Sequence, residues 1–342
     1  MKLRYAYLLA LAALAVLPLC LGGCGKHPDP QNAVDHYATG QLLMSKGDYD
    51  AAMAELGLAI RSDPNLSVAH TAMGDIFRKR EDYELARRAY EKACAANPYA
   101  FKPHYNLGVI YQKLADAEQA LAKAQEAITQ AVRAYLRALV IRGDDYDANL
   151  NLGACYFQMG KYDLAEQYCK AAIQCDPKNP AAYNNLGVIC DSQDRLYDAV
   201  RYYKESLEIN VNQPRILLNL GQTYIRQGRL RHALHTFELA AEQLPTDPAP
   251  WEQIGACYYN LGELDKALEG YSKAAQLNAK SASAWRGVGV VYMSLYVRDR
   301  AQTDLRDKAI DAWNTSLEYQ SNQDDLRKLI DKYQPKPNPP KL

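Results

Sequence analysis

A column of side-chain amides recurs along the chain at long, regular intervals. Asn106 is followed by Asn151, Asn185 and Asn219 and then by Gln253, at steps of 45, 34, 34 and 34 residues, and each amide stands two residues before a glycine. A carboxamide carries both a donor and an acceptor, so a row of amides can satisfy the backbone of an extended peptide largely irrespective of that peptide's sequence. The alternative is a solvated polar face that binds no ligand.

Histidines form a second column and a separate pair. His36, His70 and His104 each stand four residues before one of the recurring glycines. Equivalent residues on stacked units lie on the order of 10 Å apart, whereas zinc needs its ligands within about 2.1 Å of one ion. We therefore expect these three histidines to be packing residues. His232 and His235 are close enough on a helix to share a metal ion, but no third ligand is evident, and no metal site is predicted.

The cysteines do not have the spacing of a metal or redox site. Six of them follow Cys24, and none belongs to a CxxC motif: Cys94, Cys155, Cys169, Cys175, Cys190 and Cys257. In an exported chain, Cys169 and Cys190 are the first candidates for a disulfide. The alternative is that most of the six are small buried apolar residues.

The sequence contains no recognisable catalytic or polyanion-binding motif. It has no Walker loop, dinucleotide-binding glycine pattern, nucleophile elbow or HExxH motif. Forty basic residues balance forty acidic ones among 342 residues, and no basic block suits a phosphate backbone. We therefore expect no enzymatic activity, no cofactor, no small-molecule substrate and no nucleic-acid partner.

The glycines that follow the amides define an internal repeat. Eight glycines recur in the same local context, and six of the seven steps between them are 34 residues, the third step being 45. An alanine follows the glycine by twelve residues in six units, and an aromatic residue follows it by three in six units. The glycines are Gly40, Gly74, Gly108, Gly153, Gly187, Gly221, Gly255 and Gly289.

This pattern resembles the tetratricopeptide repeat, which the segment WEQIGACYYNLGELDKALEGYSKAAQLN, residues 251–278, matches closely. The resemblance implies an all-α fold, a right-handed superhelical α-solenoid of about eight helix hairpins, whose first helices line an inner groove. Small residues such as Gly108 would let two helix backbones approach closely. The units lie near 33–66, 67–100, 101–145, 146–179, 180–213, 214–247, 248–281 and 282–322, and are followed by a solvating capping helix at 323–333 and a proline-rich tail at 334–342.

Two units depart from the 34-residue period. In unit three, eleven extra residues equal three helical turns, and Asp116 with Gln119 reads as a capping box. We expect a second helix that starts there, ends at Gly143 and projects about 16 Å beyond its neighbours; the alternative is that the first helix continues and the loop shifts. In unit eight, with Ala309 and Trp313 in the repeat columns, we expect eight residues to lengthen the turn around VRDRAQTD.

The N-terminus has the layout of a secretory signal. Lys2 and Arg4 precede an apolar run from residue 5 to 16, which is short for a membrane span, so an uncleaved anchor is the weaker alternative. The residues Leu-Gly-Gly-Cys at 21–24 resemble the lipobox of bacterial lipoproteins. The resemblance implies a lipoprotein-type signal peptide at 1–24 that is cleaved just before Cys24, so that the lipidated Cys24 becomes the N-terminus, followed by a polar tether at 25–32. Gly25 in place of an aspartate favours the outer membrane.

The amide column is similar to the asparagine ladder of the O-linked N-acetylglucosamine transferase repeats and of kinesin light chains. That resemblance implies that Asn106, Asn151, Asn185, Asn219 and Gln253 hold a peptide in the groove. We expect a lipid-anchored scaffold of the bacterial cell envelope that acts as an assembly or stability factor. The alternatives are a substrate-docking subunit of a glycosyltransferase-like or proteolytic system whose catalytic part lies on another chain, and a spacer without a groove ligand.

Overall fold

The computed structural model describes residues 29–334, which form seventeen helices and no strand. The helices that make up the eight hairpins are α1 (Pro30–Ser45) with α2 (Tyr49–Ser62), α3 (Ser67–Lys79) with α4 (Tyr83–Ala96), α5 (Phe101–Ala117) with α6 (Leu121–Ile141), α7 (Tyr146–Gln158) with α8 (Tyr162–Cys175), α9 (Pro180–Ser192) with α10 (Leu196–Ile209), α11 (Pro214–Arg226) with α12 (Leu230–Gln243), α13 (Pro248–Leu261) with α14 (Leu264–Leu277), and α15 (Ala282–Arg298) with α16 (Thr303–Tyr319). The last helix is α17 (Asp324–Tyr333).

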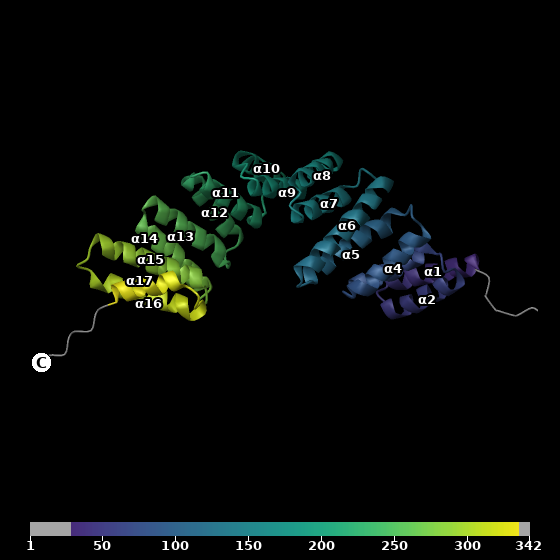
Figure 1. The fold of residues 1–342 in the computed structure, drawn as a ribbon, viewed down its shortest axis with the longest axis horizontal. Helices are drawn as coiled ribbons and strands as arrows, with labels where there is room; N and C mark the ends of the chain where they lie inside the picture. The colour runs from purple at the N-terminus through teal and green to yellow at the C-terminus, as the bar shows by residue number, and fades with distance from the viewer. Residues whose placement is uncertain (1–28, 335–342) are drawn as a thin grey trace, which may run out of the picture.

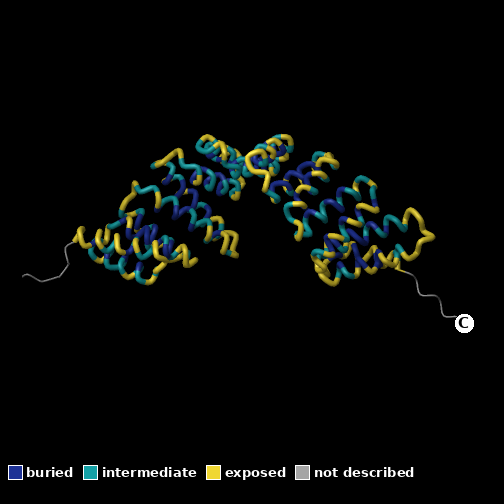
Figure 2. The backbone as a smooth tube through the Cα atoms, turned by 180° about the vertical axis from the view of Figure 1, so that it is seen from behind, coloured by how far each residue is buried: buried dark blue, intermediate teal, exposed yellow. Residues whose placement is uncertain are grey.

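The hairpins stack into an arch. Its two feet are α1–α2 and α16–α17, and α8–α10 lie at its top (Figure 1). Buried segments continue from one hairpin to the next, and the turns are exposed (Figure 2). One core cluster runs without interruption from α5 to α13. Each unit therefore buries its apolar faces on its neighbours rather than on a central core, as expected for a solenoid.

The first helix of each hairpin lies on the inner side of the curve. First helices of neighbouring units contact one another, for example α7 with α9 and α13 with α15, whereas within residues 29–334 no comparable contact joins two consecutive second helices. In a curved stack, the elements on the concave side lie closer together than those on the convex side. The surface of the odd-numbered helices α1 to α15 is called the inner face below.

The repeated glycines make room for a side chain in most units. A Cβ atom on Gly187 would lie 2.5 Å from the ring of Tyr203, and one on Gly221 would lie 2.5 Å from the ring of Phe237. An aromatic ring from the second helix covers the glycine in six of the eight units. Backbone itself comes close in unit seven, where a Cβ on Gly270 would lie 2.8 Å from the Gly255 nitrogen.

Unit three lengthens both of its helices, which corrects the expectation of one projecting helix that starts after Asp116. Asp116 lies within α5, which has 17 residues where α3 has 13, and α6 has 21 residues where α4 has 14. The connection at residues 118–120 is as short as those of regular units. The polar cap signal was misleading because α5 continues past Asp116 to Ala117, which shifts the turn as the alternative predicted, and α6 begins after Ala120 without a side-chain cap.

Unit eight accommodates its insertion in the same way. Each of α15 and α16 has 17 residues, so the extra length lies mainly in the helices and not in an enlarged turn. Ala309 and Trp313 are buried, which confirms their assignment to the repeat columns. The sequence around VRDRAQTD was expected to form a loop, but its first residues complete the last turn of α15 and its last residues begin α16.

The first helix starts earlier than expected. α1 begins at Pro30, inside the predicted tether, because the Asp29 side chain accepts a hydrogen bond of 3.2 Å from the Asn32 amide and Pro30 suits the first helical turn. The predicted signal peptide, Cys24 and residues 335–342 of the predicted tail lie outside the described residues. No helix within residues 29–334 combines the length and apolarity needed to cross a membrane.

The predicted capping helix α17 occupies the position that the first helix of a ninth unit would take. Leu326 and Ile330 are buried. Gln323 just before α17 donates 3.0 and 2.9 Å hydrogen bonds to the Ser316 hydroxyl and the Gln320 carbonyl, as Gln213 does before α11 to Ser206 and Asn210. The unpaired face of α17 carries Arg327 where six of the eight full units have an aromatic residue or histidine, and Asp331 where all eight have the glycine. That face suits water, so α17 ends the stack.

Replacing Gln323 by alanine should loosen α17 selectively. The substitution removes the amide that joins the last helix to α16, and we expect about 1 kcal/mol of local stability to be lost, which corresponds to about fivefold faster amide exchange in α17. Hydrogen–deuterium exchange measured by mass spectrometry would show this change, with α7 to α12 unaffected. Unchanged exchange in α17 would contradict the anchoring role of Gln323.

Candidate ligand-binding face

The five predicted amides lie on successive first helices, but the structure places them in different surroundings. Asn106 on α5 is buried, Asn151 on α7, Asn185 on α9 and Gln253 on α13 are partly buried, and Asn219 on α11 is exposed. The repeat period thus predicted their helices and their common column. It did not predict which of the amides are free to meet a ligand.

Asn106 belongs to a polar network inside the protein. Its side-chain nitrogen donates to Asp75 Oδ1 at 2.9 Å and to the Tyr90 hydroxyl at 3.3 Å, and Tyr90 donates to the same carboxylate oxygen at 2.7 Å. Lys102 Nζ lies 2.7 Å from Asp75 Oδ2. Burial, reinforced by the Asp75 charge, raises the pKa of Tyr90, which keeps its hydroxyl protonated as a donor. The amide of Asn106 therefore joins unit three to unit two.

Replacing Asn106 by alanine should destabilise the fold, whereas replacing Asn219 should not. Asn106 is 5% exposed and its loss removes a buried donor from Asp75, so we expect about 1–3 kcal/mol lower free energy of unfolding. Asn219 is exposed, and its replacement should change stability by less than about 0.5 kcal/mol. Urea denaturation followed by circular dichroism compares the two variants, and equal effects would contradict the structural role assigned to Asn106.

Asn151 makes a weaker contact and remains open to the inner face. Its side-chain nitrogen donates to the Tyr105 hydroxyl at 3.3 Å. Burial, together with the nearby carboxylates of Asp147 and Asp145, raises the pKa of Tyr105, so the phenol stays neutral. The Asn151 nitrogen also lies beside the Tyr135 hydroxyl, while its oxygen forms no hydrogen bond within residues 29–334 and can accept one from a ligand.

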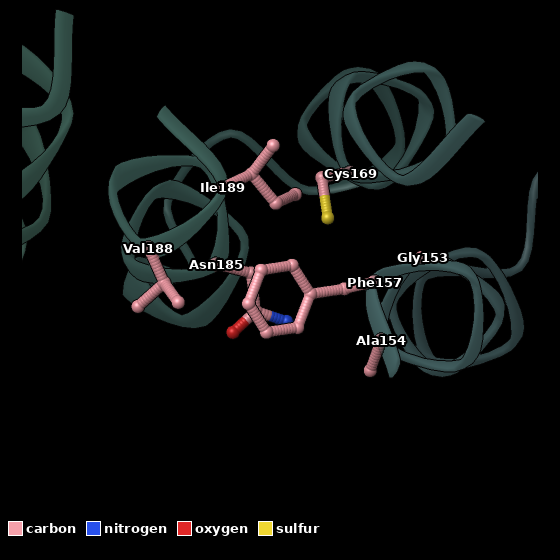
Figure 3. A pocket seen from close by; sticks show the side chains of 7 residues that line it. All are labelled: Gly153, Ala154, Phe157, Cys169, Asn185, Val188 and Ile189. Carbon is pink, nitrogen blue, oxygen red and sulfur yellow. The ribbon is translucent and has the colours of Figure 1, made fainter. Parts of the chain in front are cut away.

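A small pocket lies between α7 and α9, next to Asn185. Its volume is about 60 Å³, and its lining includes Phe157 and Ala154 from α7 and Asn185 and Val188 from α9. The ring of Phe157 extends from α7 towards α9, with the Asn185 side chain beside it (Figure 3). Within residues 29–334 the Asn185 side chain forms no hydrogen bond. An apolar pocket with one free amide can hold an aliphatic side chain and bind the adjacent backbone.

Charged groups that follow the pocket residues along the chain are already paired. On α9, Asp191 Oδ2 lies 2.7 Å from Arg226 Nη1 of α11, and Arg226 Nη2 lies 2.7 Å from Asp194 Oδ1. The segment of the inner face that includes Ala154, Phe157, Asn185 and Val188 carries no charge. Hydrogen bonding and apolar contact are therefore the chemistry that this segment offers to a ligand.

The thiol beside the pocket is not arranged for catalysis. Burial raises the pKa of Cys169 to about 12, so it is protonated at neutral pH and is a poor nucleophile. All six cysteines within residues 29–334 are free, so the disulfide considered between Cys169 and Cys190 is not formed. In the same range no group of three or more His, Cys, Asp or Glu residues is placed to hold a metal ion.

The histidine column has a structural role that recurs in other units. His70 Nε2 lies 2.9 Å from the Pro64 carbonyl and His104 Nε2 lies 3.1 Å from the Pro98 carbonyl, each six residues earlier in the chain. Trp285 donates to the Ala279 carbonyl at 2.8 Å at the same spacing. These contacts hold the turn that precedes each first helix, which confirms the prediction that His70 and His104 are packing residues. His36 instead pairs with Glu55 at 2.7 Å.

Sequence reasoning missed the apolar half of the candidate site. Phe157 and Val188 stand four and one residues after their unit's glycine, in columns whose residue type varies from unit to unit. A column without a common residue gives no periodic signal. The only available indication was the apolar character of these two first-helix positions, which the residues' contacts with the core also explain.

Comparison with protein-family models covers most of the repeat region. Tetratricopeptide repeat models match residues 36–66, 74–114 and 144–210. A model described as the cilia and flagella-associated protein 70 C-terminal domain matches residues 179–295. A comparison with curated protein sequences found no match.

Several solved structures share the fold. A tetratricopeptide repeat protein from Parabacteroides merdae is 16% identical, with a TM-score of 0.53 over 76% of this chain and 99% of that chain. PilW, described as a widely conserved type IV pilus biogenesis factor, is 22% identical, with a TM-score of 0.51 over 64% of this chain and 96% of that chain. PilF from Pseudomonas aeruginosa is 20% identical, with a TM-score of 0.52 over 64% and 94%. The repeat-family matches, the stacked helix hairpins and this shared fold identify the chain as a tetratricopeptide repeat protein.

Proposed function

We propose that the chain is a scaffold of the bacterial cell envelope that holds an extended segment of another protein against its inner face, between α7 and α9. The observation that carries this proposal is the uncharged pocket beside Phe157, with Asn185 in its lining and Asn151 on the preceding first helix. No other part of the predicted amide column combines an open amide with an apolar pocket among the described residues.

The expected ligand is an extended peptide with an aliphatic side chain at its centre. That side chain fills the pocket between Phe157 and Val188, and the amides of Asn151 and Asn185 bind the peptide's carbonyl and amide groups. Charges on the ligand contribute little at this point, because the neighbouring Arg226 is already paired with Asp191 and Asp194. Affinity therefore depends on shape and on backbone hydrogen bonds.

A lipid on Cys24 would hold this face close to a membrane. Five residues lie after Cys24 up to Asp29, the N-cap of α1, and an extended chain covers at most about 3.5 Å per residue, so the solenoid would start within about 18 Å of the lipid. The small residues before Cys24 support lipidation at that cysteine, and Gly25 in place of an aspartate favours the outer membrane. Such a protein would act as an assembly or stability factor; PilW, which shares the fold, is described as a type IV pilus biogenesis factor.

Site-specific crosslinking in intact cells tests the ligand. A photo-crosslinking amino acid at position 157 should capture a defined envelope protein, and Asn151→Ala with Asn185→Ala should lower the yield at least about tenfold, since two backbone-binding amides are lost. Asn314→Ala on α16 is the matched control, because that side chain is exposed on a second helix. Equal yields from the double variant and the control would exclude this face as the binding site.

Membrane attachment has its own test. Cys24→Ser should abolish incorporation of an alkyne-labelled palmitate and move the protein from the membrane to the soluble fraction. Wild-type protein that carries no label would exclude lipidation at Cys24, without bearing on the peptide site between α7 and α9.

A further inference from the structure

Trp251 departs from the structural role of its column. In five other units, the side chain four residues before the glycine bonds to a carbonyl six residues earlier and holds the turn before the first helix. These residues are His70, His104, Asn149, Tyr183 and Trp285. The indole nitrogen of Trp251 is buried and forms no hydrogen bond within residues 29–334. Its half-buried side chain lines a groove on the outer surface instead.

This groove lies between α12 and α14, with α13 beneath it. Its volume is about 450 Å³, within the range of ligand sites. Trp251 and Tyr258 of α13 are its aromatic residues, and both are half-buried. They stand seven residues apart on one helix, so they lie about 10 Å apart along its axis. Grooves lined by aromatic rings bind proline-rich segments in the extended polyproline conformation.

The walls of the groove carry two carboxylates without a counterion. Glu242 of α12 and Glu269 of α14 are exposed, and neither forms an ion pair with any residue that the structure describes. The other charged groups of the lining are engaged. Lys266 Nζ lies 2.8 Å from Glu263 Oε2, and Glu238 has a histidine of its own helix at 3.9 Å. The groove therefore offers one free negative charge on each wall.

The chain itself contains a segment of matching chemistry. Residues 335–342, which lie outside the described residues, read PKPNPPKL, with four prolines, two lysines and no acidic residue. Pro337 and Pro340 stand three residues apart, which is one turn of a polyproline helix, or about 9 Å. That spacing is close to the distance between Trp251 and Tyr258 along α13. Two prolines of the segment can therefore contact both rings at once.

The lysines of the segment match the free carboxylates. Lys336 and Lys341 stand five residues apart, about 15 Å in a polyproline helix. By the 34-residue period, Glu269 is level with a position of α12 that is seven residues before Glu242. Seven residues along the helix and at least about 10 Å across the groove place the two glutamates about 15 Å apart. One lysine can thus pair with each wall while the prolines occupy the floor.

We propose that the groove between α12 and α14 binds residues 335–341 of a second copy of the chain. Pro337 and Pro340 of the second copy lie on the rings of Trp251 and Tyr258, and its two lysines pair with the two free carboxylates. The contact joins two different surfaces, the tail of one molecule and the groove of another. It lies on the outer surface, away from the pocket between α7 and α9.

The tail must come from another molecule because a chain's own tail is too short. α17 ends at Tyr333, and Pro337 is four residues further on, so it reaches at most about 14 Å from that end. α17 takes the place of a first helix in a ninth unit, whereas the groove lies between units six and seven. Two units at about 10 Å each already exceed this reach. α17 lies at a foot of the arch, and α12 lies closer to its top (Figure 1).

Charge exchange tests the proposal on the full chain. Sedimentation equilibrium in density-matched detergent should show self-association that weakens with salt. A tail variant carries Lys336→Glu with Lys341→Glu, and a groove variant carries Glu242→Lys with Glu269→Lys. Each should lower the association constant at least about tenfold, because like charges then face each other. A chain with all four substitutions should regain the wild-type constant within about threefold.

Mixing the two variants distinguishes exchange between molecules from a tail that folds back. In the mixture, the acidic tail of one variant meets the basic groove of the other, and the basic tail meets the acidic groove. The mixture should therefore associate at least about tenfold more strongly than either variant alone. Pro337→Ala with Pro340→Ala tests the prolines separately and should weaken self-association at least about fivefold, because the tail loses its preformed extended conformation.

The controls separate this contact from general charge effects and misfolding. Glu126→Lys with Glu208→Lys makes the same charge change at exposed positions of α6 and α10 and should leave self-association intact. Circular dichroism establishes that every variant is folded. Wild-type protein that stays monomeric at low salt at every loading concentration overturns the proposal. Association that survives the tail or groove variant, or a mixture that fails to associate, overturns it as well.

Discussion

Replacing Gly187 by alanine is expected to lower the free energy of unfolding by about 1–3 kcal/mol, although alanine favours helix more than glycine does. The added Cβ would lie 2.5 Å from two ring carbons of Tyr203, whose side chain is 2% exposed. The ring cannot turn aside within a close-packed interior, so α9 and α10 must separate. The temperature of the helix-to-coil transition, followed by circular dichroism at 222 nm, should fall accordingly.

Gly57 provides the matched control for this prediction. It also lies in a helix, α2, but a Cβ there would meet no atom within 4 Å. Gly57→Ala should therefore stabilise the protein by about 0.5–1 kcal/mol through helix propensity alone. Opposite signs for the two glycine-to-alanine changes are the result that supports the packing explanation. Stabilisation by both would show that the hairpin tolerates a methyl group under the ring.

A charge in the pocket between α7 and α9 should abolish ligand capture. Val188→Arg fills the pocket beside Phe157 with a long side chain and places a cation there that has no acidic partner in the lining. Residues at the centre of an interface cost about 2–4 kcal/mol when they are disrupted, so we expect about 30- to 1,000-fold weaker binding of the captured segment. Fluorescence anisotropy with a labelled peptide from that segment measures the effect.

Val297 offers the corresponding control outside the pocket. It is 47% exposed near the end of α15, so Val297→Arg makes the same chemical change at a distant position. The two variants should have similar thermal stability because neither position is fully buried. Binding that is equally weak in both, or unchanged in both, would contradict the placement of the site between α7 and α9.

Much of the architecture could be predicted from the glycine period, because close packing at one position per unit must recur wherever two helices form the same hairpin. The period could not place the helix ends in units three and eight. An insertion of eleven or eight residues satisfies the same spacing whether it enlarges a turn or extends the helices. In unit three both helices are longer, because the alanine-rich sequence on either side of Leu121 favours helix. Asp116, which resembles a helix cap, had predicted a helix start at the wrong place.

The candidate site was only partly predictable, for a different reason. A column of identical residues reveals a shared position but not its surroundings, which depend on the neighbouring unit. Asn106 meets Asp75 and Tyr90 and becomes part of the interior, while Asn185 meets Phe157 and an open pocket. Asp75, the acceptor in this network, has no equivalent carboxylate in unit four, where Ala154 holds the same column.

The position of α17 has a practical consequence for protein engineering. A helix that already stacks in step with the preceding units is a ready attachment point for consensus modules. Exchanging Arg327 for an aromatic residue and Asp331 for glycine, and then appending one designed second helix, would turn the terminal half-module into a complete one. The binding arch could be lengthened in this way at its carboxyl end, with the pocket between α7 and α9 left as it is.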